Sequence, residues 1–317
     1  MLRSGNERAA GDVGPLQIAE IAPVWILVFL GALDLGLSYL ARYAFTGFSF
    51  VLAPIALMAG ISYAYRRNGR SRTIADMGYY GAMWISFTAL GAIFTYLMAR
   101  PGLPLLDDQF ARFDAAIGFD WLRWHRFLAG FHSINLMLEI AYSSLLLQIM
   151  VSVIYFSHVG QSERNADLLW SAFIALLFTA VLSSVFPALG AFQHFHMDLP
   201  RATHLPHLLA LRDGSMSVFP LYQMQGIIAF PSFHTVMAIL FIYAFRGKGW
   251  WFLLIGLLNI LMLLSTPTFG GHYFADMVSG ALIAGLAIYL VSRRRRAFTP
   301  DRVRTINVPA TSASSGR

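Results

Sequence analysis

The stretch that decides the fold runs from Trp250 to Arg296 and reads WWFLLIGLLNILMLLSTPTFGGHYFADMVSGALIAGLAIYLVSRRRR. Two apolar runs, approximately 249–267 and 272–292, flank a short polar break, and a row of arginines follows the second run. A helix needs about 20 apolar residues to cross the hydrocarbon core of a bilayer. Because backbone polar groups cannot stay unpaired in lipid, both runs are predicted to be transmembrane helices.

Apolar runs of this kind recur along the chain. Of its 317 residues, 57% are hydrophobic and only 12% are charged, which indicates an integral membrane protein. The further runs that we predict to span the membrane are 21–44, 47–65, 77–99, 133–157, 168–190 and 231–246. A transmembrane barrel would show short alternating segments instead. The sequence therefore predicts an all-α fold, a polytopic membrane bundle of about eight transmembrane helices.

The net charge of +7 at pH 7 is divided among short loops next to the predicted spans. Three basic clusters carry much of it: Arg66, Arg67, Arg70 and Arg72; Arg246 and Lys248; and Arg293 to Arg296. With an even number of spans, all three clusters lie on one side, which the positive-inside rule assigns to the cytoplasm together with both termini. This distribution indicates membrane topology and not nucleic-acid binding. We expect a multi-pass protein of a bacterial inner membrane.

The predicted organisation has four parts. They are a cytoplasmic N-terminal segment 1–20, two additional N-terminal spans in 21–75, a membrane domain 76–292, and a basic, disordered cytoplasmic tail 293–317. The first apolar run lacks a small-residue cleavage site, so we expect it to stay as an anchor. This topology sends the loops 100–132 and 191–230 to the extracytoplasmic face.

These two loops contain most of the aromatic and histidine residues that lie outside the predicted spans. The stretch 104–130 mixes aromatic residues with arginines and aspartates, which is typical of helices in the membrane interface. We expect an interfacial packing element there, with a cap over the site or a guide for a lipid as the alternatives. The loop 191–230 contains His194, His196, His204 and His207. Imidazole is a common metal ligand, but no cysteine or HExxH motif accompanies these residues, so we expect no metal and no other cofactor.

The beginning of the last predicted span pairs a histidine with a carboxylate. On a helix expected to begin near Gly271, His272 and Asp276 are four residues apart and lie on one face. A carboxylate beside an imidazole fixes its tautomer and raises its basicity. His272 is therefore predicted to be a nucleophile or a base.

A second histidine lies at the start of another span, in FPSFHTVMAILF, residues 230–241. His234 falls in the first turn there, and Pro231 suits an early helical position whose amide needs no partner. Unpaired amides at a helix start favour an anion. Ser232 and the backbone at Gly270 and Gly271 add donors of the kind that hold phosphate oxygens. Two histidines, one aspartate and an anion site indicate phosphoryl transfer through a phosphohistidine.

The two stretches carry a family resemblance. PSFH at 231–234, followed by GGHYFAD at 270–276, closely resembles the type 2 phosphatidic acid phosphatase (PAP2) superfamily. The second and third signatures of that superfamily are a PSGH-like stretch and SRxxxxxHxxxD. The resemblance implies a six-helix core in which His272 is the nucleophile, Asp276 its orienting partner and His234 the general acid.

The sequence departs from the family pattern in its cations. The first signature, KxxxxxxRP, is absent after the fifth predicted span, and Arg100–Pro101 resembles its ending two spans too early. Thr266 replaces the arginine of the third signature. Because an anion in a buried site needs compensating groups, we expect Arg212, and His194 or His196, to bind the substrate phosphate.

These departures look like the inositolphosphotransferase branch, similar to inositol phosphorylceramide synthases. That likeness implies transfer of a phosphoryl group to a lipid alcohol rather than to water. The expected partners are membrane lipids: a phospholipid or lipid phosphate as substrate and a lipid alcohol as acceptor. The alternatives are a simple phosphatase of the phosphatidic acid or polyprenyl phosphate type and a non-catalytic lipid or phosphate carrier. A transporter using Asp34 and Glu139 is a further alternative, although internal pairing of these two residues is favoured.

Overall fold

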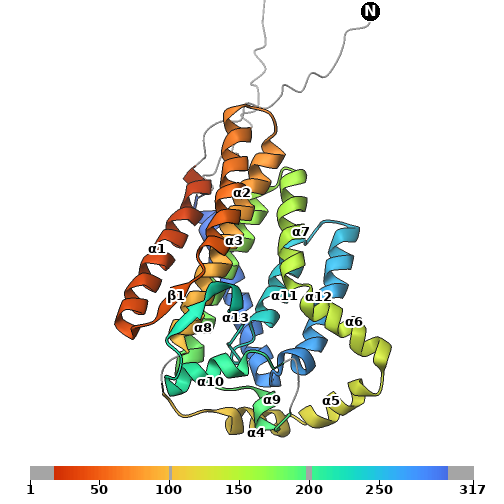
Figure 1. The fold of residues 1–317 in the computed structure, drawn as a ribbon. Helices are drawn as coiled ribbons and strands as arrows, with labels where there is room; N and C mark the ends of the chain where they lie inside the picture. Colours follow the sequence, from red (N-terminus) through yellow and green to blue (C-terminus); the bar gives the residue numbers. More distant parts are fainter. Residues whose placement is uncertain (1–17, 100–101, 198–201, 299–317) are drawn as a thin grey trace, which may run out of the picture.

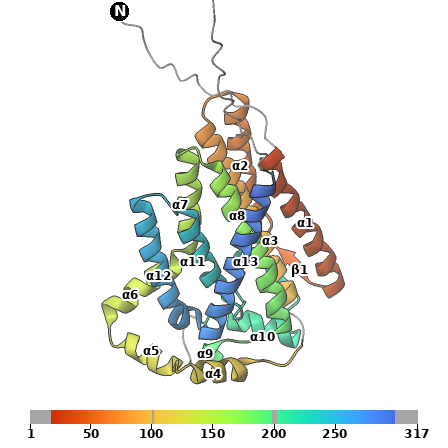
Figure 2. The same cartoon turned by 180° about the vertical axis from the view of Figure 1, so that it is seen from behind.

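The computed structural model describes residues 18–99, 102–197 and 202–298. Over these ranges the chain forms a bundle of helices (Figure 1, Figure 2). Among the described residues, six helices are long and apolar enough to cross a membrane. They are α1 (Ile18–Ala41), α2 (Ser49–Arg67), α3 (Arg72–Met98), α8 (Ser162–Val185), α12 (Trp250–Gly270) and α13 (Phe274–Phe298). The predicted all-α, polytopic membrane architecture is confirmed.

The remaining elements are shorter. The helices among them are α4 (Asp107–Ala116), α5 (Trp121–Ala129), α6 (His132–Ser143), α7 (Leu145–His158), α9 (Ala191–His194), α10 (Leu205–Asp213), the 3-10 turn η1 (Leu221–Gln223) and α11 (Phe233–Ala244). The strands β1 (Ala44–Thr46) and β2 (Val218–Pro220) pair in parallel, with Phe45 opposite Phe219. This small sheet, which the sequence did not predict, ties the segment after α1 to the segment after α10.

Two of the predicted spans differ in the structure. The run 133–157 forms α6 and α7, two helices bent by 55° that make a seventh span only if they are counted together. The run 231–246 forms α11, which has only 12 residues. Hydropathy marked both segments as apolar, but it does not specify where a helix bends or how soon it ends.

The core lies where α3, α7, α8, α11 and α13 meet. Its fully buried side chains include Tyr80, Phe156, Met237, Phe241 and Phe245. In contrast, α1 and α2 lie at the side of the bundle and contact mainly α3 (Figure 1). The helices that carry the histidine motifs are therefore packed in the interior, against α8.

The basic clusters meet around the first turns of α8. Arg66 of α2 donates to buried Asp76 of α3 at 2.9 Å, and the hydroxyl of Ser162 in α8 donates to the same carboxylate. Arg164 of α8 donates to the carbonyl oxygen of Arg246, which follows α11. These contacts hold the α2–α3 connection and the α11–α12 connection at one end of the bundle.

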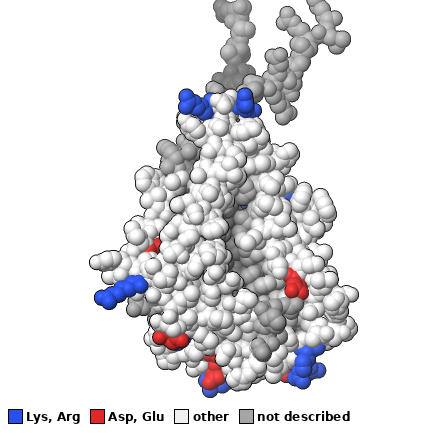
Figure 3. Space-filling model, viewed as in Figure 1, with Lys and Arg blue, Asp and Glu red and all other residues white. Residues whose placement is uncertain are grey.

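The end of α13 joins them there. Arg295 pairs with Asp167 of α8 at 2.9 Å and also with Glu163. On the face drawn in Figure 3, Lys and Arg side chains lie at the top end, and acidic and basic side chains are scattered over the lower half. Helices α4, α5, α9 and α10 lie at the end opposite the basic clusters, beside the starts of α11 and α13 (Figure 1, Figure 2).

Several predicted features fall on residues outside those described. These are most of the N-terminal segment 1–20, the tail beyond residue 298, and Arg100–Pro101. The structure therefore tests neither the predicted cytoplasmic segments nor the Arg–Pro pair.

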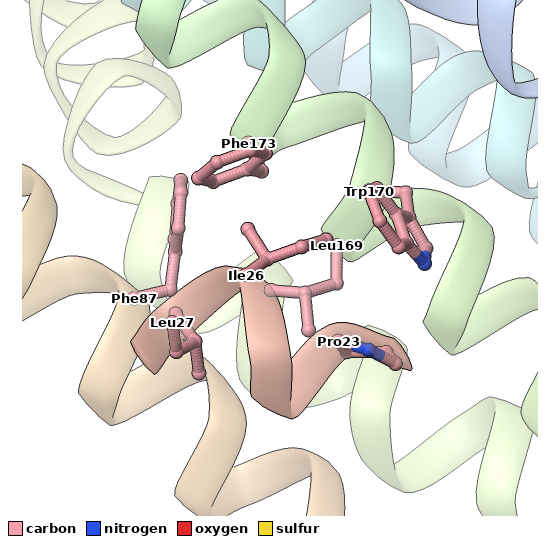
Figure 4. A pocket seen from close by; sticks show the side chains of 7 residues that line it. All are labelled: Pro23, Ile26, Leu27, Phe87, Leu169, Trp170 and Phe173. Atoms are coloured by element: carbon pink, nitrogen blue, oxygen red, sulfur yellow. The ribbon is translucent and has the colours of Figure 1, made fainter. Parts of the chain in front are cut away.

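One small pocket lies between α1, α3 and α8 (Figure 4). Its lining is apolar and consists of Pro23, Ile26, Leu27, Phe87, Leu169, Trp170 and Phe173. None of these side chains is titratable, so the pocket is a packing gap beside α1 and offers no group for phosphate chemistry.

The close approach of α2 and α3 predicts a difference between two glycines. A methyl group on Gly78 of α3 would lie 2.6 Å from the carbonyl oxygen of Met58 and 2.9 Å from the amide of Ser62, whereas nothing lies within 4 Å of such a group on Gly60. We expect Gly78→Ala to cost about 1–3 kcal/mol by overpacking. Gly60→Ala should be neutral or stabilising, because alanine is the better helix former. Equal thermal unfolding midpoints of the two purified variants in detergent would contradict this packing.

Candidate active site

The two motif histidines and the aspartate lie at the end of the bundle opposite the basic clusters. His234 is in the first turn of α11, His272 lies between α12 and α13, and Asp276 is in the first turn of α13. His272 Nδ1 lies 3.2 Å from the Asp276 carboxylate and 2.7 Å from the carbonyl oxygen of Ala229. His272 and Asp276 are both buried. The predicted contact between imidazole and carboxylate is therefore present.

The partners of His272 fix its tautomer. A carbonyl oxygen and a carboxylate only accept hydrogen bonds, so Nδ1 has to carry the proton that both atoms receive. Neutral imidazole has one donor and one acceptor nitrogen, so the lone pair is on Nε2. His272 is thus oriented by its second nitrogen, with Nε2 available to attack an electrophile.

The backbone around His272 differs from the prediction. Helix α12 continues through Pro267 and ends at Gly270. Its C-cap, Gly271, has a left-handed φ of +63°. Helix α13 begins only at Phe274, so the expected helix start near Gly271 was wrong. His272 lies in the connection, and it reaches Asp276 because the carboxylate turns back and also accepts from the amide of Tyr273 at 2.8 Å.

The start of α11 also differs. The helix begins at Phe233 with Ser232 as its N-cap, so the placement of Pro231 at an early helical position was wrong. The hydroxyl of buried Ser232 accepts from the amide of Thr235 at 3.4 Å, which is the usual role of an N-cap serine. The amide of Ser232 donates to the carbonyl oxygen of Asp276 at 3.0 Å. Ser232 thereby joins the starts of α11 and α13.

Tyr142 of α6 is a site residue that the sequence analysis missed. Its ring stacks on that of half-buried His234, with centroids 4.0 Å apart and an interplanar angle of 14°. A methyl group on Gly270 would lie 2.8 Å from the Tyr142 hydroxyl and 3.1 Å from His272 Nε2. Both atoms therefore pack closely against Gly270, where any side chain would collide with them. No sequence signal marked Tyr142, a lone tyrosine in the middle of a predicted span.

Glycines allow the loop after α8 to reach this connection. A methyl group on Gly190 would lie 2.9 Å from the Gly271 carbonyl oxygen, and one on Gly271 would lie 2.6 Å from the ring of Phe192. The amide of Ala191 donates to that same carbonyl at 2.7 Å. The segment after α8 thus packs directly on the residue before His272.

The predicted phosphate-binding side chains occupy two places. His194 Nδ1 lies 3.5 Å from the carboxylate of Asp108, and its ring is 6.1 Å from that of Tyr273, the neighbour of His272. Arg212, in the last turn of α10, donates to the carbonyl oxygen of Leu103 at 2.7 Å. His194 therefore lies beside the third motif, whereas the structure ties Arg212 to the segment before α4.

His204 is a further histidine near His272. It is half-buried before α10, and its pKa is lowered to about 4, mainly by burial and in addition by repulsion from His272 when both rings are protonated. It is therefore neutral at pH 7 and offers a hydrogen bond rather than a cation. His207 instead contacts the hydroxyl of Tyr96 through Nδ1 at 2.8 Å. Across the described ranges, no group of three or more His, Asp or Glu side chains is arranged to hold a metal ion.

Comparisons with known proteins agree with this geometry. The model of the PAP2 superfamily matches residues 108–290, which run from α4 to near the end of α13 and contain His234, His272 and Asp276. No curated protein and no solved structure gave a match. Members of this superfamily are typically phosphatases or phosphotransferases. Because the matched region covers more than half of the sequence and includes the whole constellation around His272, the chain belongs to the PAP2 superfamily.

Proposed function

We propose that this chain is a membrane-embedded phosphotransferase or phosphatase that acts on a lipid phosphate ester or phosphodiester through a phosphohistidine at His272. One observation carries the proposal. His272 Nδ1 is held by two acceptors, so the lone pair of the imidazole is on Nε2, which lies close to Gly270 as the Tyr142 hydroxyl does. Superfamily membership supports phosphoryl transfer as the reaction class.

The proposed reaction has two steps. Nε2 of His272 attacks phosphorus while the bond from phosphorus to the leaving oxygen breaks, and His234 donates a proton to that oxygen. The oxygen of the acceptor then attacks the phosphohistidine and passes its proton to His234, which frees His272 again. Asp276 stabilises the positive charge on the imidazole of His272 during the first step. The stacking of Tyr142 on His234 supports a fixed position for the general acid.

Phosphate binding in this scheme uses cations and backbone donors together. Arg212 and His194 are the proposed side-chain ligands. The backbone at Gly270 and Gly271, together with Ser232, completes the anion site. Preorganised donors of this kind stabilise developing charge on phosphoryl oxygens, so the scheme requires no metal. The capping bond of Ser232 favours a supporting role for its hydroxyl over a direct contact with the substrate.

A lipid substrate is supported by the position of the site. The histidines lie at the end opposite the basic clusters, which the positive-inside rule makes the extracytoplasmic face. At that end, Arg123, Arg126 and the exposed ring of Phe127 border a shallow surface depression on α5. Trp121 fixes α5 against α12 by donating to the Pro267 carbonyl oxygen at 3.1 Å. Arginine and aromatic side chains on one short helix suit lipid headgroups at a membrane surface.

The acceptor decides between the two activities. The departures from the family signatures favour transfer to a lipid alcohol, as in the inositolphosphotransferase branch, and the alternatives are a simple lipid phosphate phosphatase and a non-catalytic carrier. Purified protein with a panel of lipid phosphates and phosphoinositides distinguishes them. A new phospholipid indicates a transferase, and free phosphate alone indicates a phosphatase. Binding without any product contradicts the enzyme proposal.

The nucleophile assignment predicts a large loss of turnover in His272→Gln. We expect a fall of about 10³-fold or more, because only binding and electrostatic stabilisation remain after a nucleophile is removed. Acid-quenched wild-type protein should carry an acid-labile phosphate on the peptide that contains His272. His158→Gln is the matched control, because His158 is exposed in the last turn of α7. Full activity of His272→Gln would contradict the assignment of His272 as the nucleophile.

The general-acid assignment predicts that the leaving group determines the defect of His234→Gln. With an alkyl phosphate ester we expect a loss of about 10²–10⁴-fold, the usual contribution of proton transfer. With an aryl ester whose phenol leaves without protonation, the loss should shrink to less than about tenfold. The measurement compares both substrates on the same protein preparation. Equal losses on the two esters would mean that His234 positions the substrate and does not protonate it.

A further inference from the structure

Two buried aspartates of α4 face the connection that contains His272. Asp107 and Asp114 are seven residues apart, which places them on one face of the helix two turns apart. Asp107 is only 9% exposed, and Asp114 is only 3% exposed. A carboxylate is rarely buried unless specific partners compensate for its lost hydration.

Asp114 receives its hydrogen bonds from the start of α13. One carboxylate oxygen accepts from the amide of Phe274 at 2.8 Å and the other accepts from the amide of Ala275 at 3.1 Å. These amides belong to the first turn, where no carbonyl of the same helix is available. Asp114 therefore caps α13 from another helix, 160 residues away in sequence.

Asp107 receives its hydrogen bonds from two further segments. Its carboxylate accepts from the amides of Leu189 and Gly190, at 3.0 and 2.8 Å, and from the hydroxyl of Tyr273 at 3.1 Å. Burial and the neighbouring carboxylates raise the pKa of Tyr273, so this hydroxyl keeps its proton and donates it. The same loop donates from Ala191 to the carbonyl of Gly271.

Both sides of the nucleophile are thus attached to α4. Asp107 holds the loop that contacts Gly271 and also the ring of Tyr273, and Asp114 holds the two residues that begin α13. We propose that Asp107 and Asp114 are positioning residues that set the orientation of His272. This inference rests on the proposed function of His272 as the nucleophile. Neither carboxylate contacts the imidazole, so their effect on catalysis passes through the backbone.

Asparagine is the informative substitution at both positions. It keeps the size of the side chain, but its amide nitrogen cannot accept a hydrogen bond from a backbone N–H. Asp114→Asn therefore leaves one first-turn amide of α13 unpaired. Burial raises the pKa of Asp114 and the two amide hydrogen bonds lower it, which indicates that the amides stabilise the ionised form. The substitution also removes a negative charge that is favourable at a helix start.

The chain provides a matched control in Asp76. This aspartate of α3 is equally buried and hydrogen-bonded, but it lies at the opposite end of the bundle with Arg66 and Ser162. Asp76→Asn should lower thermal stability without changing the turnover of the folded protein. It separates a general loss of stability from a misplaced nucleophile.

The experiment measures kcat, KM and the rate of phosphohistidine formation for Asp107→Asn, Asp114→Asn and Asp76→Asn, each corrected for folded protein. A displacement of about 1 Å at a reacting centre costs about 10²-fold. We expect kcat and phosphohistidine formation to fall by about that factor in the two α4 variants, with KM within about threefold. For Asp76→Asn, kcat should stay within about twofold. A kcat loss in Asp114→Asn no larger than that in Asp76→Asn would overturn the inference.

Tyr273→Phe is a milder variant, for the case in which an α4 variant does not fold. It removes only the hydroxyl bond to Asp107 and keeps the ring. We expect kcat to fall by about threefold to tenfold, and the double variant with Asp107→Asn to lose less than the product of the single losses. Fully multiplicative losses would mean that Tyr273 and Asp107 act independently, which contradicts positioning through this contact.

Hydrogen exchange gives a readout that does not depend on turnover. Amides in the peptide that covers 271–277 should exchange faster in Asp114→Asn than in wild type, and Asp76→Asn should leave that peptide unchanged. If wild type shows no turnover while this difference is present, the proposed function fails and the positioning of the connection stands. If wild type turns over and the exchange of this peptide is unchanged in Asp114→Asn, the positioning inference fails.

Discussion

The non-helical connection between α12 and α13 is the constraint on which the site depends. In a membrane protein, backbone outside a helix is tolerated only where protein or water satisfies its polar groups. Here the Gly271 carbonyl accepts from Ala191, the Tyr273 amide donates to Asp276, and the first amides of α13 donate to Asp114. The loop after α8 and helix α4 are therefore required neighbours of this connection, and together they close that end of the bundle.

The same constraint orients His272. His272 lies within the connection, so its Nδ1 meets acceptors on two different segments, Ala229 before α11 and Asp276 in α13. The imidazole thus has little rotational freedom, and Nε2 is the nitrogen that these two acceptors do not hold. Gly270 packs closely against this ring and against the Tyr142 hydroxyl, and Tyr142 in turn stacks on His234. The fixed orientation of His272 follows from how the backbone of the connection is satisfied.

The two ends of the bundle are held by different kinds of contact. At one end, the basic clusters are held around α8 by contacts such as those of Asp76 and Arg295. At the other end, short helices cover the histidines and the carboxylates pair with backbone amides instead of arginines.

The sequence by itself determined the helical class, six of the eight predicted spans and the contact of His272 with Asp276. These follow from local physics, because apolar runs have only one way to satisfy their backbone in lipid and residues four apart are neighbours on or near a helix. The two signatures that contain the histidines, in 230–241 and 265–280, are also local patterns that can be found without coordinates.

Only the tertiary structure decided where the helices bend and which distant groups complete the site. The break between α6 and α7, the end of α12 at Gly270 and the capping role of Ser232 changed details that hydropathy had left open. Tyr142 and Asp114 carry no local signal of function, since one lies in an apolar run and the other in an amphipathic stretch. Their roles arise from contacts between segments far apart in the chain, such as the 160 residues that separate Asp114 from Phe274. Such contacts depend on how helices pack, and packing is a property of the whole chain rather than of any stretch of sequence.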